Sequence, residues 1–264
     1  MLLINILFSF GLVSCISLCD KYTTALFTNN TAENQLTLIT LVVNTAIIGN
    51  YTKGAMNVVP GILAHGDIDG KMVNLLPFFD GSMNTTNVNN MPVKVNFLDD
   101  GGASPLLLNK PANGMNSKQY TLVTHLYKVF GGLLECSQQS NGSVFKSYDG
   151  VTSMFEVHKF MKLDNAQVMY FIKQVGLAAL SFGVSMEDTN SIGNTLTNLF
   201  LMKCDIPIAL VPGAIPDSQS ICIADDCPVA KSCTSTPTFT PMSNSANRAD
   251  RINVFYGLLG LTLF

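Results

Sequence analysis

The apolar positions of the chain recur at helical spacing in several stretches. The longest stretch covers residues 165–181, which are apolar on nearly every side, and a helix of that kind is expected inside a protein core. Asp164 and Gln167 stand at the spacing of a capping box, which marks the start of this helix. The pattern therefore predicts a buried helix near the centre of the fold.

Three other segments are also predicted to be helical. Residues 119–135 carry an apolar stripe at helical spacing. Another helix is expected from Ser185 onward. Two carboxylates follow in its first turn, where they suit the helix dipole. Residues 35–48 are rich in β-branched side chains, so a strand stays open there, but the length of the run favours a helix.

The remaining segments are less regular. Residues 51–72 indicate a loop, and residues 81–118 combine many Asn, Gly and Pro residues with one alternating run, 93–97, that predicts a small strand or a hairpin. Beyond Cys204, repeated prolines exclude long helices. The predicted fold class is therefore all-α, with a loop and β insertion at about 81–118 and a Cys-rich C-terminal extension.

Both ends of the chain have the pattern of processing signals. Residues 1–18 are apolar and end in small residues, as in a secretory signal peptide, although a lipoprotein cleavage box at Cys15 is an alternative. Residues 247–264 end in an apolar run after a polar spacer, which is typical of a GPI-attachment propeptide, with Asn244 as the expected site of the lipid anchor. An uncleaved membrane tail is the other interpretation.

These signals divide the chain into four parts. A signal peptide at 1–18 and a main domain at 19–205 are followed by a Cys-rich and Ser/Thr/Pro stalk at 206–246 and the propeptide at 247–264. We therefore expect a secreted protein that is held at the outer leaflet of the plasma membrane by its lipid anchor alone.

Composition agrees with export and argues against nucleic acid as a partner. The net charge is −3, whereas nucleic-acid binding needs a basic face. Four glycosylation sequons are present, at Asn29, Asn50, Asn84 and Asn141. The cysteines outside the signal peptide are disulfide candidates whose pairing is left open: Cys19, Cys136, Cys204, Cys222, Cys227 and Cys233.

The candidate chemistry lies in two histidines. The chain has no Walker loop, no dinucleotide-binding glycine fingerprint and no HExxH motif. His125 falls on the apolar stripe of residues 119–135, and His158 lies shortly before the buried helix. Neutral imidazole is a good axial ligand for haem iron, but two core histidines held by ordinary hydrogen bonds would give the same pattern.

Residues 119–204 resemble group I truncated globins. The resemblance rests on Tyr148-Asp-Gly150, then Met154-Phe-Glu-Val-His158, and two final helical segments with Phe182-Gly-Val184 between them. Upstream, Leu76-Pro-Phe-Phe-Asp80 is similar to a family segment whose phenylalanine packs on the porphyrin. The insertion at 81–118 departs from the family, and Ile47 stands where many relatives have a tyrosine that steadies bound oxygen.

The resemblance implies a truncated-globin-like helical sandwich that holds haem b. His158 would be the proximal iron ligand, and His125 would face it from the distal side. The implied pocket walls, which ordinary core packing would also explain, are Phe79, Leu122, Val129, Met154, Met161, Leu163, Val168 and Phe171.

The expected function is therefore haem binding at the cell surface, with a diatomic gas such as O2 or NO as a candidate ligand at the iron. Capture of haem and electron transfer are compatible with the same residues. One alternative is a surface haem enzyme, either a peroxidase or an NO dioxygenase, with His125 as acid or base. Another is a cofactor-free adhesin on a degenerate globin scaffold.

Overall fold

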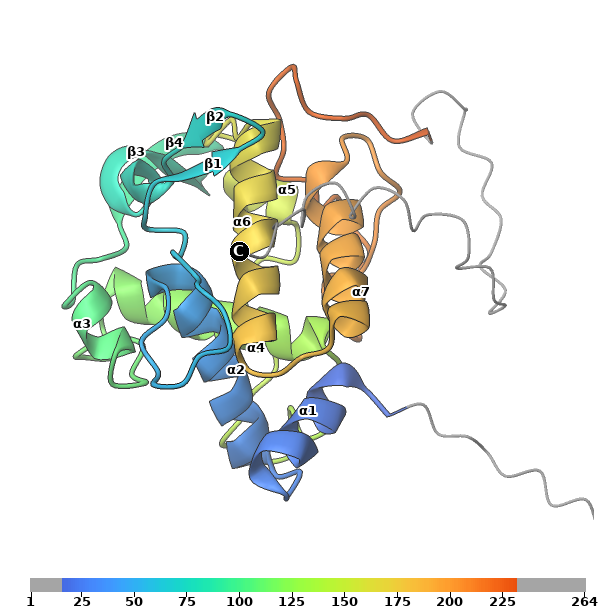
Figure 1. Ribbon diagram of the computed structural model, residues 1–264. Helices are drawn as coiled ribbons and strands as arrows, with labels where there is room; N and C mark the ends of the chain where they lie inside the picture. The colour runs from blue at the N-terminus through green and yellow to red at the C-terminus, as the bar shows by residue number, and fades with distance from the viewer. Residues whose placement is uncertain (1–15, 232–264) are drawn as a thin grey trace, which may run out of the picture.

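The computed structural model describes residues 16–231 (Figure 1). Most of the predicted signal peptide, Cys233, the proposed anchor at Asn244 and the terminal propeptide lie outside these residues. Within 16–231, no helix combines the length and apolar character needed to cross a membrane.

Seven α-helices lie in the described part of the chain. They are α1 (Leu18–Phe27), α2 (Ala32–Ile48), α3 (Ala103–Leu106), α4 (Lys118–Leu133), α5 (Met154–His158), α6 (Asn165–Ser181) and α7 (Met186–Leu196). A π-helical turn, η2 (Thr197–Leu201), continues α7, and a short 3-10 turn, η1 (Leu76–Phe78), lies between the two sheets in the sequence. The helices predicted from hydrophobic spacing are thus present, and residues 35–48 are helical.

The prediction of an all-α fold is wrong, because the protein is mixed α and β. Two small antiparallel sheets are present, one formed by β1 (Gly66–Ile68) and β2 (Lys71–Val73) and the other by β3 (Asp80–Val88) and β4 (Met91–Asn96). Asn89 and Asn90 have positive φ angles of 51° and 62° at the β3–β4 turn, which suits a two-residue hairpin. Residues with positive φ angles close both hairpins, Asn89 and Asn90 in one and Asp69 and Gly70 in the other.

Helix α6 forms the centre of the core. It packs against α2 and α7, and α2 packs against α4 (Figure 1). Val168 and Ile172 of α6 are fully buried, as expected for a helix that is apolar on nearly every side. The capping box predicted for Asp164 and Gln167 is present, with both reciprocal hydrogen bonds formed.

The segment after residue 205 packs against the stretch around α5. The Ser153 hydroxyl donates to the Ser218 carbonyl at 3.0 Å, and the Gln219 side-chain oxygen accepts from the Met154 N–H at 3.1 Å. The same Gln219 side chain donates to the carbonyl of Thr152 at 2.9 Å. The C-terminal extension therefore supports the short helix that carries His158.

Two disulfides form among the candidate cysteines. Cys19 pairs with Cys136 and ties α1 to the end of α4, and Cys222 pairs with Cys227 within the extension. Cys204 also lies in the described region, in the turn that follows η2. Disulfides of this kind are typical of oxidising compartments.

The four sequons differ in their accessibility. Asn29, Asn50 and Asn141 are exposed, whereas Asn84 lies in β3 and is partly buried. The three exposed sites can accept a glycan without disturbing the core, and Asn84 lies close to the interior wall that β3 forms.

The two disulfides should contribute unequally to stability. Cys19–Cys136 closes a sequence separation of 117 residues, and Cys222–Cys227 closes one of 5. Loop-closure entropy predicts losses of about 4–5 kcal/mol and about 2 kcal/mol on their removal. Urea unfolding of the two double Cys→Ala variants measures both values. Equal losses would contradict the loop-entropy origin of the difference.

Candidate functional site

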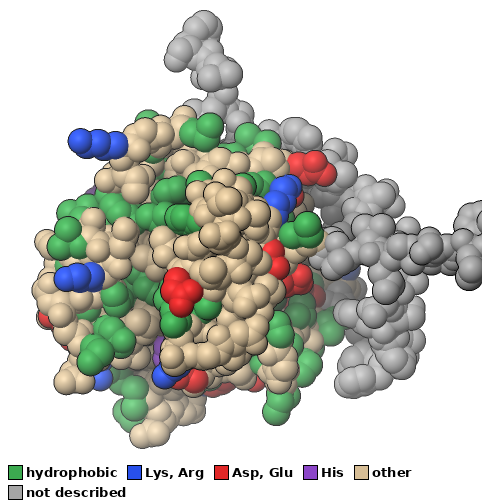
Figure 2. Space-filling view, turned by 90° about the horizontal axis from the view of Figure 1, so that it is seen from below, with side chains coloured by type: hydrophobic (Ala, Val, Ile, Leu, Met, Phe, Trp, Pro, Cys, Tyr) green, Lys and Arg blue, Asp and Glu red, His purple; other side chains and the backbone are tan. Residues whose placement is uncertain are grey.

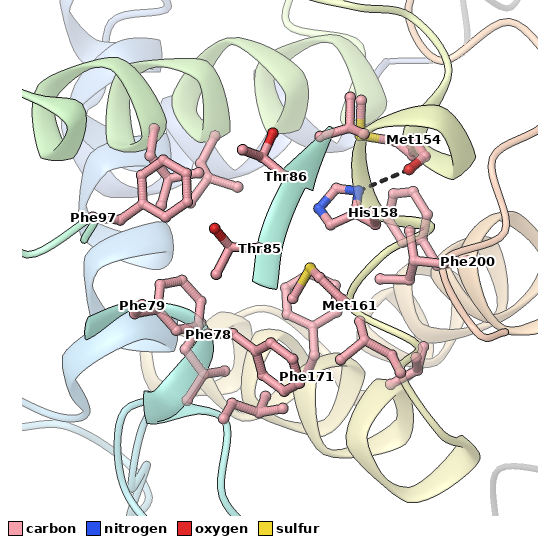
Figure 3. Close-up of a pocket in the computed structure, with 18 of the residues that line it drawn as sticks. Phe78, Phe79, Thr85, Thr86, Phe97, Met154, His158, Met161, Phe171 and Phe200 are labelled. Atoms are coloured by element: carbon pink, nitrogen blue, oxygen red, sulfur yellow. Dashed lines mark hydrogen bonds between the residues drawn. The ribbon is translucent and has the colours of Figure 1, made fainter. Parts of the chain in front are cut away.

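A cavity of about 220 Å³ lies between α4, α5 and α6 (Figure 3). Its walls come from these helices, from η1 and the β3–β4 hairpin, from η2, and from the C-terminal extension through Ile221. Aromatic side chains form much of the lining, namely Phe78, Phe79, Phe97, Phe130, Tyr148, Phe171 and Phe200. Polar groups are few, so an occupant would be held mainly by apolar contact.

The structure brings all ten residues of the predicted pocket to this one cavity. They come from three stretches of the chain, at 79, 122–129 and 154–171. The residues are Phe79, Leu122, His125, Val129, Met154, His158, Met161, Leu163, Val168 and Phe171.

His158 lies on the cavity wall, where one hydrogen bond orients its ring. Its Nδ1 lies 2.8 Å from the carbonyl oxygen of Met154, one turn earlier in α5. A carbonyl oxygen can only accept, so in the neutral ring the proton is on Nδ1 and Nε2 carries the lone pair. Figure 3 shows the second ring nitrogen directed into the cavity, on the side where Thr85 and Thr86 lie. Metal-ligating histidines are typically oriented by such a bond.

The surroundings of His158 favour the neutral ring. Burial lowers the pKa of His158 below its ordinary value, and the hydrogen bond to Met154 opposes this shift only in part. A neutral imidazole is the form that binds a metal ion. The state needed for ligation is therefore the resting state of the side chain at neutral pH.

His125 lies at the mouth of the cavity. Its side chain is 35% exposed, and its Nε2 lies 3.7 Å from a carboxylate oxygen of Asp149. The same carboxylate accepts a hydrogen bond from Lys128 at 2.6 Å, and the His125 ring meets the Tyr148 ring edge-on at 5.3 Å. Burial and the Lys128 charge lower the pKa of His125, while Asp149 raises it. The two histidines thus have different surroundings.

Several lining residues were missed by sequence reasoning. Thr85, Thr86 and Phe97 come from the hairpin region that was interpreted mainly as a loop, and Ile221 comes from the extension. The alternating run at 93–97 and the Asn89-Asn90 pair were the available signals for the hairpin. No sequence signal indicated that the hairpin folds over a cavity.

Ile47 does not line the main cavity. It lies on a separate apolar space of about 20 Å³ between α2 and α6, together with Val43 and Val175. Ile62, Leu126, Phe130 and Phe171 line both spaces. Replacing Ile47 would therefore act on the main cavity only through these shared side chains.

Other features of residues 16–231 add no further candidate site. No group of three or more His, Cys, Asp and Glu side chains in this range could hold a metal ion. On the face shown in Figure 2, positive and negative side chains are scattered among hydrophobic and neutral ones. No protein-family model, curated protein or solved structure matches the chain. The case for a function therefore rests on the cavity.

The lowered pKa of His158 predicts a pH dependence of stability in the cofactor-free protein. Because the folded-state pKa is below the unfolded value of about 6.5, the unfolded chain binds more protons in the window between them. The free energy of unfolding should fall as the pH is lowered through 6.5. Urea unfolding at pH 7 and pH 5 measures this fall, and His158→Gln should show a smaller fall than the wild-type protein. An equal fall in both proteins would contradict the attribution of the pH dependence to His158.

Proposed function

We propose that the protein binds haem b in this cavity, with His158 as the axial ligand of the iron. One observation carries the proposal. The Nδ1 of His158 is bonded to the carbonyl of Met154, and the other nitrogen faces a mainly apolar cavity. A histidine held in this way has a fixed tautomer and an available lone pair.

The walls of the cavity suit the flat, apolar faces of haem. Phe79 and Phe171 stand on the same cavity as His158, and Met154, Met161 and Leu163 come from the same local stretch of chain. Aromatic and methionine side chains pack well on ring systems and adapt to their shape. The partly open mouth would leave the charged edge of a haem in contact with water.

The arrangement of helices gives further support. Helices α2, α4, α6 and α7 form the main packed body (Figure 1), and the short α5, which carries the candidate ligand, contacts β3. The succession of α4, α5, α6 and α7 along the chain is the one that the resemblance to truncated globins implied for residues 119–204.

The volume of the cavity sets a condition on binding. About 220 Å³ lies below the usual range of ligand pockets, which is about 300–1,000 Å³. Haem binding therefore requires one wall to move outward. The β3–β4 hairpin is joined to α5 through hydrogen bonds of the Asn87 and Asn90 side chains, and we expect this wall to move.

Bound haem would supply an iron atom that can take a diatomic gas such as O2 or NO. His158 would hold this iron, and the apolar walls would keep water from it. The two disulfides and the accessible sequons support a protein exported to the cell surface. Attachment there by a lipid at Asn244 is part of the same proposal.

A second candidate function is a haem peroxidase. The observation that favours it is the contact between His125 and Asp149 at the mouth of the cavity. A carboxylate next to an imidazole can orient it as a general acid or base. His125 is close enough to the cavity to serve a reaction there, since it lines the same space.

Haem loading tests the main proposal. The purified protein should give a Soret band when titrated with haem, and His158→Gly should lose it. Imidazole added to His158→Gly should restore the band, because it replaces the missing ligand in the space left by the side chain. His65→Ala serves as the matched control, since His65 is exposed in a loop.

A folded wild-type protein that stays colourless with haem would overturn the proposal and would favour the adhesin interpretation. A Soret band that survives in His158→Gly without imidazole would contradict the assignment of the ligand while keeping haem binding.

The peroxidase candidate makes a separate prediction. If His125 is the acid or base, His125→Leu should reduce peroxidase turnover by about 10²- to 10⁴-fold with the Soret band intact. Steady-state oxidation of a chromogenic donor by hydrogen peroxide measures the change. Equal turnover in the two proteins would leave His125 as a residue of the cavity mouth without an acid–base role.

A further inference from the structure

The cavity as it stands in the structure, with the β3–β4 hairpin closed over it, has the size of a small molecule. Its volume of about 220 Å³ equals that of about seven water molecules in the liquid, so a single substituted ring would fill it. Two hydrogen bonds hold the hairpin in this closed position. The Asn87 side-chain amide donates to the Glu156 carbonyl at 3.0 Å, and Lys159 donates to the side-chain oxygen of Asn90 at 2.7 Å.

The wall of the closed cavity favours a neutral occupant. None of the described residues that line it is a Lys, Arg, Asp or Glu, and burial lowers the pKa of His158, which keeps its ring neutral. At the mouth, Lys128 and Asp149 pair with each other at 2.6 Å. An ion placed in this cavity would lose its hydration without gaining a counter-charge, which is costly.

Most polar side chains of the wall already have partners in the protein. The Thr85 hydroxyl accepts from the Val95 N–H at 3.2 Å, within the hairpin. The Tyr148 hydroxyl donates to the Val151 carbonyl at 2.9 Å. The side-chain oxygen of Gln167 belongs to the capping box of α6. These oxygens are therefore committed to the fold and not to an occupant.

His158 presents a hydrogen-bond acceptor to the cavity. Its Nδ1 donates to the Met154 carbonyl at 2.8 Å, so Nε2 carries the lone pair. Within residues 16–231 this Nε2 has no hydrogen-bond partner, and Figure 3 shows it directed into the cavity. An acceptor shielded from water and left without a partner costs free energy, which a donor on an occupant would recover.

We propose that the haem-free protein binds a small phenol in the closed cavity, with the phenol hydroxyl donating to Nε2 of His158. The aromatic lining suits the ring, because aromatic pairs gain stability beyond the area that they bury. This inference goes beyond haem binding, since it needs no iron and uses the closed hairpin. A phenol and haem would exclude each other, because both would use the same nitrogen.

Calorimetric titration of the haem-free protein with p-cresol and p-xylene tests the proposal. The two probes differ only in that one has a hydroxyl where the other has a methyl group. In His158→Leu the hydroxyl loses its acceptor while the wall stays apolar. The affinity for p-cresol should then fall by about five- to 150-fold relative to that for p-xylene, the range for a buried polar group left unpaired.

Matched controls separate this hydrogen bond from a general loss of structure. Binding of p-xylene shows that the cavity of a variant is intact, and His158→Met replaces His158→Leu if the leucine variant does not fold. Thr86→Val removes another hydroxyl from the wall and should lower the affinity for p-cresol less than His158→Leu. His65→Ala, in an exposed loop, should change neither affinity.

A larger phenol tests the closed position of the hairpin. With its second ring, p-phenylphenol exceeds the volume of the closed cavity and should bind more weakly than p-cresol. Tighter binding of p-phenylphenol would overturn the closed cavity as the site.

Equal losses of p-cresol and p-xylene affinity in His158→Leu would overturn the hydrogen bond to His158. A wild-type protein that takes up no p-cresol would overturn the inference, whether or not haem gives a Soret band. Binding of p-cresol by a protein that shows no Soret band with haem would support this inference and overturn haem binding alone.

Discussion

The hydrogen bond between His158 Nδ1 and the Met154 carbonyl is the interaction on which the site depends. It selects the tautomer, sets the direction of the ring and leaves the second nitrogen facing the cavity. Both partners belong to α5, a helix of only five residues. A helix this short is not stable by itself in water, so its position has to come from other parts of the chain.

Segments distant in sequence supply that support from two sides. Gln219 bonds the backbone at Met154, and Ser218 bonds Ser153 at the start of α5. From the other side, Asn87 of the hairpin bonds the carbonyl of Glu156. The extension and the insertion, which are the two parts that lack a counterpart in the family resemblance, therefore both hold the helix that carries the candidate ligand.

The sequence predicted the helical core well because the physical signals for it are local. Apolar spacing and the Asp164 cap are properties of neighbouring residues, and they located α6 to the residue. The all-α class failed because β1 and β2 have only three residues each, too few for a period-2 pattern, and because the Asp69-Gly70 turn between them was not recognised as a hairpin signal.

The residues of the candidate site also fall into those that the sequence predicted and those that it missed. Residues near His158 were found because the family resemblance is most specific there. Thr85 and Thr86 could not be found, because their inward direction depends on a bulge that only the pairing with β4 defines. The placement of His125 at the cavity mouth likewise depends on Asp149 and Tyr148, which a loop brings to it after α4 has ended.

The unequal strength of the links around the cavity suggests how an occupant could enter. The Cys19–Cys136 disulfide joins α1 to the end of α4, outside the cavity. It stabilises the helical core without closing the cavity. The hairpin wall is joined to α5 by side-chain hydrogen bonds, and each such bond contributes only about 1 kcal/mol. Local opening of the hairpin should therefore cost much less than global unfolding, which requires about 5–15 kcal/mol. A cavity that is small when closed can then widen for a large ligand while the helical core stays folded.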